Sequence, residues 1–197
     1  KIGRNSVFSQ SLNDTELSNA GYINKGSFFA ENPANWTQVT PAANWLPRKE
    51  HASVVFATSG ELGIPKMWVI GGKPCNIANS CNGMWPTNDV WYSADGNIWT
   101  KAGNAPWPIR RGHSAVVFQN KMWVIGGSDS YICFPDDGTF PCCYNNETNG
   151  SNHLYDMWNS ADGVNWTQVS DPGGYLFVIG PLHSSIVYNN KIWIMGG

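Results

Sequence analysis

Short segments recur along the 197-residue chain at matching positions, so the chain is built from repeated units. The pattern Lys-x-Trp-x-x-Gly-Gly occurs at Lys66–Gly72, Lys121–Gly127 and Lys191–Gly197. A second pattern runs from Asp-x-Trp through Ser-Ala-Asp-Gly to Trp-Thr, and it occurs at Asp89–Thr100 and Asp156–Thr167. Such a repeat predicts one supersecondary unit that buries its apolar face against copies of itself.

A histidine followed by an apolar run is the third recurring segment, and an aromatic residue stands six positions before each copy. Ten of the 11 tryptophans fall in repeated positions, so we interpret tryptophan as part of the framework. We expect each recurring histidine to hydrogen-bond the backbone where a strand begins. These histidines are His51, His113 and His183.

The recurring segments have the composition of β-strands. They are runs of about five to seven residues rich in Val, Ile, Trp and Phe, bounded by Gly, Asn, Asp and Pro, and none shows helical periodicity. The links Gln119–Lys121 and Asn189–Lys191 are long enough only for hairpin turns. Ala94–Asn97 and Ala161–Val164 supply the turn of a second hairpin. The predicted fold class is therefore all-β, with four antiparallel strands in about 60 residues, as in a β-propeller blade.

The segment Arg110–Gly127, followed by Trp158 and Trp166, resembles the Kelch family of β-propeller repeats. The resemblance covers the chain from about Phe28 to Gly197. It implies that the diglycine ends the second strand of each blade and that the spaced aromatics lie in the third and fourth strands. The glycines to which it gives this structural role are Gly71, Gly72, Gly126, Gly127, Gly196 and Gly197.

A weaker likeness is to the Asp-box of sialidase-type propellers, in Ser93–Trp99 and Ser160–Trp166. Asp-boxes are turns that stabilise the fold and lie away from the catalytic centre. This resemblance implies that Asp95 and Asp162 are structural residues.

The repeats divide the chain into five parts. Residues 1–25 form an N-terminal segment, 26–47 a half blade with the third and fourth strands, 48–109 a blade, 110–181 a blade with a long cysteine-bearing loop, and 182–197 a half blade with the first two strands. These parts amount to three blades, whereas closed propellers use about four to eight. Three alternatives follow: a fragment of a longer propeller, two copies that close a six-bladed ring, or a head-to-tail fibre.

The cysteines all lie in the two loops that follow a diglycine. We expect Cys75 to pair with Cys81, and Cys133 with either Cys142 or Cys143, which leaves one thiol over. A disulfide reduces the conformational freedom that a long loop must give up on folding. Zinc is not favoured, because no Cys-x-x-Cys pair or histidine cluster is present. The cysteines therefore indicate an oxidising, extracellular location.

Glycosylation sequons agree with that location. Only 13% of the residues are charged, and N-linked glycans would supply hydration that so few charges do not. The sequence Asn-x-Ser/Thr occurs at Asn13, Asn35, Asn146, Asn149 and Asn165.

Several functional classes find no support in the sequence. A net charge of −2 argues against nucleic acid as a partner, and no apolar run approaches the roughly 20 residues of a membrane span. Sialidases need an arginine cluster for the substrate carboxylate, but Arg48 and Arg110 occupy the same repeat position. Copper ligands of the galactose-oxidase type cannot be placed from the spacing. We therefore expect no cofactor, metal or catalytic residue.

The function that we predict is an extracellular, non-enzymatic structural or protein-interaction module, glycosylated and self-assembling or part of a larger propeller. Its partners would be copies of itself or other extracellular proteins. The alternative is a carbohydrate-binding or carbohydrate-active propeller enzyme.

Overall fold

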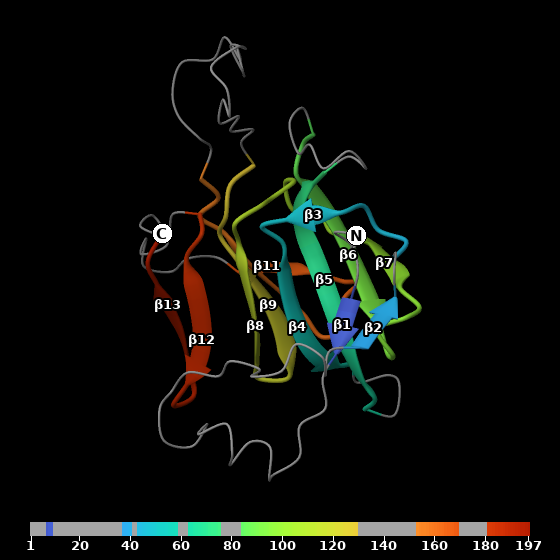
Figure 1. Cartoon of the computed structure of the whole chain (residues 1–197). Coiled ribbons are helices and arrows are strands. Elements are labelled where there is room, and N and C mark those ends of the chain that lie inside the picture. The colour runs from blue at the N-terminus through green and yellow to red at the C-terminus, as the bar shows by residue number, and fades with distance from the viewer. Residues whose placement is uncertain are drawn as a thin grey trace, which may run out of the picture.

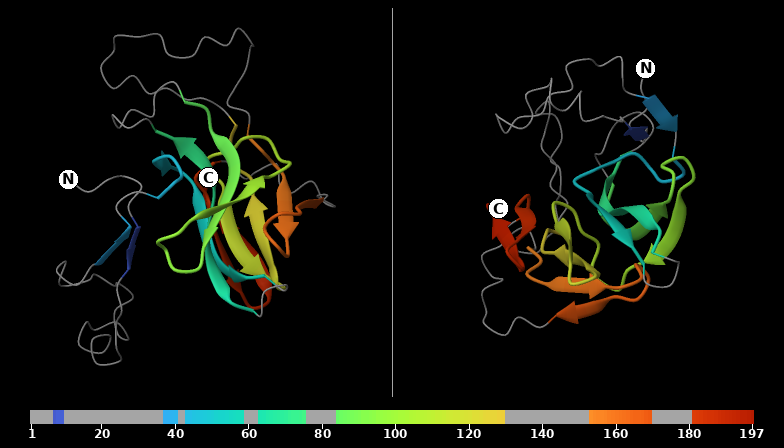
Figure 2. Two further views of the ribbon diagram at one scale, coloured as in Figure 1. Left: turned by 90° about the vertical axis from the view of Figure 1, so that its right-hand side faces the viewer. Right: turned by 90° about the horizontal axis from the view of Figure 1, so that it is seen from below.

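The computed structural model describes residues 7–9, 37–40, 43–58, 63–75, 84–129, 153–169 and 181–197. These residues include β-strands that pair into antiparallel sheets, and the sheets are arranged in an arc (Figures 1 and 2). The described residues contain no helix with the length and apolarity needed to cross a bilayer.

The first blade consists of β4 (Ala52–Ala57), β5 (Pro65–Pro74), β6 (Thr87–Ser93) and β7 (Thr100–Asn104), paired in that order. The long β5 also pairs at its far end with β3 (Arg48–Lys49).

The second blade consists of β8 (Ser114–Phe118), β9 (Lys121–Ile125), β10 (Met157–Ser160) and β11 (Thr167–Val169), again paired in sequence order. Gln119 and Asn120 join β8 to β9 with φ values of 48° and 55°. Positive φ at both central residues is the geometry of a type I′ hairpin turn, whose twist matches that of its strands. The prediction of four-stranded antiparallel blades is confirmed.

Incomplete sheets lie at both ends of the arc. At the C-terminal end, β12 (Ser184–Tyr188) pairs with β13 (Lys191–Met195) in a two-stranded sheet. At the N-terminal end, β2 (Thr37–Thr40) pairs with β1 (Val7–Ser9). The sequence predicted no strand within residues 1–25, because three residues carry no readable periodicity. The third strand predicted before β2 lies outside the described residues.

The apolar core lies between the blades, because each sheet has one face toward each neighbour. Trp68 and Ile70 of β5 pack with Met122 and Val124 of β9 in one cluster between the first and second blades. A second cluster joins Val116 of the second blade to residues of β13. The blades are thus held together face to face by alternating strand residues.

Candidate interaction surface

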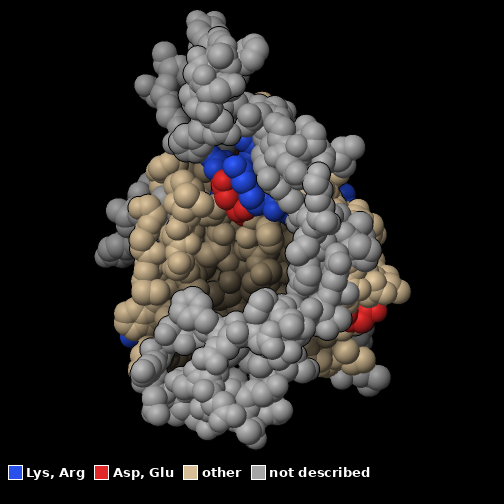
Figure 3. All heavy atoms as spheres, in the orientation of Figure 1, with Lys and Arg blue, Asp and Glu red and all other residues tan. Residues whose placement is uncertain are grey.

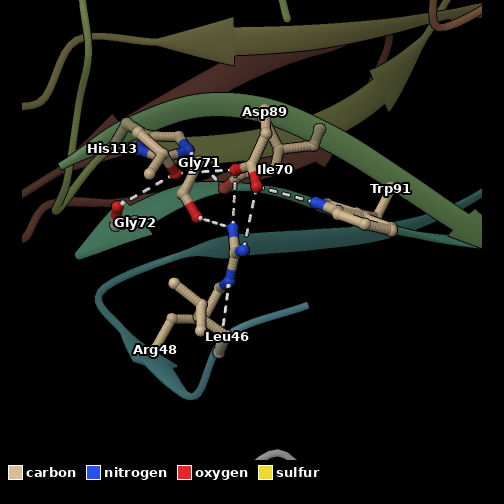
Figure 4. A network of polar contacts seen from close by, with 9 residues as sticks. Leu46, Arg48, Ile70, Gly71, Gly72, Asp89, Trp91 and His113 are labelled. Atoms are coloured by element: carbon tan, nitrogen blue, oxygen red, sulfur yellow. Dashed lines mark hydrogen bonds and ion pairs between the residues drawn. The ribbon is translucent and has the colours of Figure 1, made fainter. Parts of the chain in front are cut away.

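A buried ion pair ties the connection before the first blade to the blade itself (Figure 4). The two terminal nitrogens of Arg48 donate to the carboxylate oxygens of Asp89 at 2.7 and 2.9 Å. Arg48 also donates to the Gly71 carbonyl at 2.9 Å, and the Trp91 indole donates to Asp89 at 2.7 Å. This fork-to-fork geometry is the strong form of an arginine–carboxylate contact.

The second blade repeats the network. Arg110, which is fully buried, donates to both oxygens of Asp156 at 2.8 Å and to the Gly126 carbonyl at 2.9 Å. The Trp158 indole donates to Asp156 at 2.7 Å, and the guanidinium carbon of Arg110 lies 5.4 Å from the centre of the Trp107 ring. In each blade, the carbonyl of the first glycine of the diglycine therefore accepts a hydrogen bond from the arginine that stands three residues before the histidine.

The carboxylates of these networks remain charged. Burial alone would raise the pKa of Asp89, but the hydrogen bonds and positive charge of Arg48 outweigh it and hold that pKa below its ordinary value. Arg110 does the same for the pKa of Asp156. Sequence reasoning missed both carboxylates, although each begins the recurring Asp-x-Trp pattern in a blade that also has the arginine.

The recurring histidines link neighbouring blades. The His113 ring nitrogen Nε2 lies 3.1 Å from the carbonyl oxygen of Ile70 in the preceding blade, so Nε2 donates. The ring nitrogen Nε2 of His183 instead lies 2.8 Å from the hydroxyl of Ser114 in the second blade. His51, the first of the series, is exposed.

Burial strongly disfavours a charged ring at His113. Burial first, and then the positive charge of Arg110, lower its pKa from 6.5 to about 3. The ring is therefore neutral near pH 7. Burial and the hydrogen bond to the Ile70 carbonyl make His113 part of the contact between the two blades.

A backbone ladder runs through the residue that precedes each histidine. The Gly112 amide donates to the Glu50 carbonyl at 2.9 Å, and the Leu182 amide donates to the Gly112 carbonyl at 2.7 Å. The three residues share positive φ values of 57°, 62° and 68°. The side chains of Glu50 and Arg111 form an ion pair between the two complete blades. Figure 3 shows charged side chains gathered at the rim of a hollow whose other described surface is uncharged.

The carboxylates of Asp95 and Asp162 accept hydrogen bonds from the backbone of the turns in which they lie. Asp95 Oδ1 accepts the amides of Asn97 and Ile98 at 2.8 and 2.9 Å. Asp162 Oδ1 accepts the equivalent amides of Val164 and Asn165 at 2.8 and 2.7 Å. Burial would raise the pKa of Asp162, but the hydrogen bonds from Asn165 and its neighbours lower it to about 2.

The predicted disulfide and glycosylation residues are only partly described. Cys75 is buried and disulfide-bonded. Asn165 is exposed, and its side-chain amide donates to Asp162 Oδ2 at 2.7 Å. Within the described ranges, no three His, Cys, Asp or Glu side chains gather to hold a metal ion. The other predicted residues lie outside those ranges: Cys81, Cys133, Cys142, Cys143, Asn13, Asn35, Asn146 and Asn149.

The largest exposed apolar feature of the described C-terminal half blade is one sheet face. Ile186 and Tyr188 of β12 are 49% and 67% exposed, and Trp193 and Met195 of β13 are 46% and 49% exposed. Leu182, just before β12, is also exposed. We refer to the four strand residues, Ile186, Tyr188, Trp193 and Met195, as the terminal face. Exposed apolar side chains gathered on one face are typical of protein–protein contacts, so the terminal face is the candidate interaction surface.

Comparisons with known proteins agree with the blade architecture. Residues 109–138 match the model of the Kelch motif. No curated protein sequence matches the chain. The chain is similar to the solved structure of YjhT, a Kelch-repeat propeller protein, with a TM-score of 0.54 and 19% identity. The match covers 84% of this chain and 43% of YjhT, so the chain spans less than half of that protein. The chain therefore carries a Kelch motif and is built of Kelch-type β-propeller blades.

Proposed function

We propose that the chain is an extracellular, non-enzymatic structural module that binds protein, including copies of itself, through an exposed sheet face. The terminal face carries this proposal. It presents four large apolar side chains on the paired strands β12 and β13, with Trp193 and Tyr188 among them. Aromatic side chains are suited to protein interfaces because they bury much area at little cost in conformational entropy. Where these residues form part of a larger propeller, the same face receives the next blade.

The use of the recurring polar residues supports a structural role. Arg48 and Arg110 are buried and bonded to carboxylates of their own blades. His113 is buried against the preceding blade. A side chain buried within the framework is not available to polarise or protonate a substrate.

The extracellular location is supported by the disulfide at Cys75, because disulfides persist in oxidising compartments. The sequon at Asn165 is exposed. Its neighbour Trp166 is buried, so an attached glycan would lie on the outer surface without disturbing the core.

Expression of the chain through a secretory pathway tests the proposal. We expect a glycoprotein with a mass that falls on treatment with an N-glycosidase, and with particles or fibres of more than one chain by sedimentation and electron microscopy. Hydrolysis or saturable binding of glycans by single 21.7 kDa chains would contradict it and favour the carbohydrate-directed alternative.

A further inference from the structure

The terminal face occupies positions that are covered elsewhere in the same molecule. Ile186 of β12 corresponds to Val116 of β8, and Met195 of β13 corresponds to Ile125 of β9. Val116 and Ile125 are 7% and 0% exposed because the next sheet packs on them, whereas Ile186 and Met195 are each 49% exposed. The terminal face therefore has the composition of a blade-to-blade contact and not of a solvent-facing sheet.

A blade-to-blade contact needs a second surface, and the first blade exposes positions that belong to that surface. Val117 of β8 packs against the first blade, but its equivalent in β4, Val55, is 62% exposed. His113 is 5% exposed, whereas its equivalent His51 is exposed. These positions of the first blade are the ones that a preceding blade would cover.

We propose that the terminal face of one copy docks on the exposed face of the first blade of a second copy. The inference rests on the proposed function and deepens it by naming the partner and both surfaces. The chain already makes this kind of face-to-face contact twice, between the first and second blades and between the second blade and the half blade. The proposed contact between two copies would be the third.

The contacts between blades of one chain predict which residues would meet between two copies. Trp68 lies so close to Gly163 that a Cβ there would be 2.2 Å from the ring, so the ring of one blade rests on the turn glycine of the next. Trp193 corresponds to Trp68, and it would rest on Gly96 of the second copy. Glycine is needed at both turns, since φ is 77° at Gly163 and 76° at Gly96.

The polar links of the existing contacts have counterparts as well. His113 bonds the Ile70 carbonyl across one blade contact, so His51 of the second copy would bond the Met195 carbonyl of the first. The backbone ladder from Leu182 through Gly112 to Glu50 would continue from the Glu50 amide of the second copy to the Leu182 carbonyl of the first. The docking surface therefore has specific hydrogen bonds as well as apolar area.

Within the described residues, one arc does not bring its own terminal face to its first blade. The half blade of β12 and β13 lies at the opposite end of the arc from β1 and β2 (Figures 1 and 2). The match covers 43% of the YjhT chain, so a propeller of that size would hold two such arcs. Two head-to-tail contacts would then close a ring of two chains.

Two single substitutions on opposite surfaces test the contact. Val55→Glu and Tyr188→Glu change residues that are 62% and 67% exposed, so each variant should fold. Each should weaken self-association about 100-fold or more, because a buried unpaired charge is strongly unfavourable. Val164→Glu is the matched control, since Val164 is 57% exposed on the second blade and lies in neither surface. Sedimentation velocity measures the mass, and near-ultraviolet circular dichroism checks the fold.

We expect the glycan-free wild-type chain and the control to have twice the 21.7 kDa mass, and each test variant to be monomeric. A mixture of the two variants should recover a dimer, because one intact contact remains between them. Fibres in the wild type that both variants abolish would support the same contact. A monomeric wild type, or assembly that Val55→Glu leaves unchanged, would overturn the inference. In the latter case the chain still self-associates, so the proposed function would stand without this contact.

Discussion

At the scale of single residues, the buried arginine–aspartate pairs make the fold sensitive to substitution. Arg110 and Asp156 have side-chain exposures of 0% and 15%, and their bidentate contact compensates for the loss of hydration. A buried pair of this kind adds little beyond well-packed apolar groups, but the loss of one partner leaves an uncompensated charge. The arginine and aspartate are therefore required together.

Arg110→Met should lower the free energy of unfolding by about 3 kcal/mol, because Asp156 then stays buried without its partner. Urea unfolding followed by tryptophan fluorescence measures the loss. The double variant Arg110→Met with Asp156→Leu should recover most of it. If the single variant lost less than about 1 kcal/mol, the pair would not have the role that its burial implies.

His113 should make the fold sensitive to acid. Its pKa is about 3 when folded and 6.5 ordinarily, so between these values the unfolded chain binds more protons. Stability is thus fully present above pH 6.5 and is lost as the pH falls from 6.5 toward 3. Asp89 and Asp156, with lowered pKa values, add a loss in the same direction at the acid end.

His113→Gln keeps a donor for the Ile70 carbonyl but cannot be protonated in this range. Unfolding measured from pH 7 to pH 5 should give a flatter pH profile for this variant than for the wild type. Parallel profiles would show that another group controls the acid response.

At the scale of strands and turns, the repeats were sufficient to predict the blades. Hairpin links such as Gln119–Lys121 are too short for any other connection, and alternating apolar residues set which face is buried. The arginine–aspartate networks could not be predicted in the same way. Arg110 and Asp156 are 46 residues apart, and only the pairing of strands brings them together. The interblade ladder uses backbone groups, for which the sequence contains no signal.

The turn glycines connect the strand scale to blade packing. Gly163→Ala would place a Cβ 2.2 Å from the Trp68 ring at a φ of 77°, so both the packing and the backbone would be strained. Gly63→Ala is the matched control, since its φ is 69° and nothing lies within 4 Å. We expect the control to cost about 1 kcal/mol and Gly163→Ala at least about 2 kcal/mol more. Equal losses in thermal unfolding would mean that the ring moves aside freely.

At the scale of the whole molecule, the arc links stability to association. The half blade of β12 and β13 packs on the second blade through Ile192 and Ile194, but its other face is the exposed terminal face. A two-stranded sheet covered on one side only has marginal stability. Burial of the terminal face by a second copy would therefore stabilise the half blade as well as the assembly.

This linkage predicts that the thermal midpoint of the wild-type chain rises with protein concentration, because association stabilises the folded state by mass action. The midpoint of Val55→Glu should not depend on concentration, since that variant cannot receive the terminal face. Differential scanning calorimetry across a hundredfold range of concentration measures both. The half-blade amides should also exchange faster with solvent in the variant than in the wild type, whereas amides of β9, which is paired on both sides, should not change. Equal concentration dependence in the two proteins would place the association on another surface of the arc.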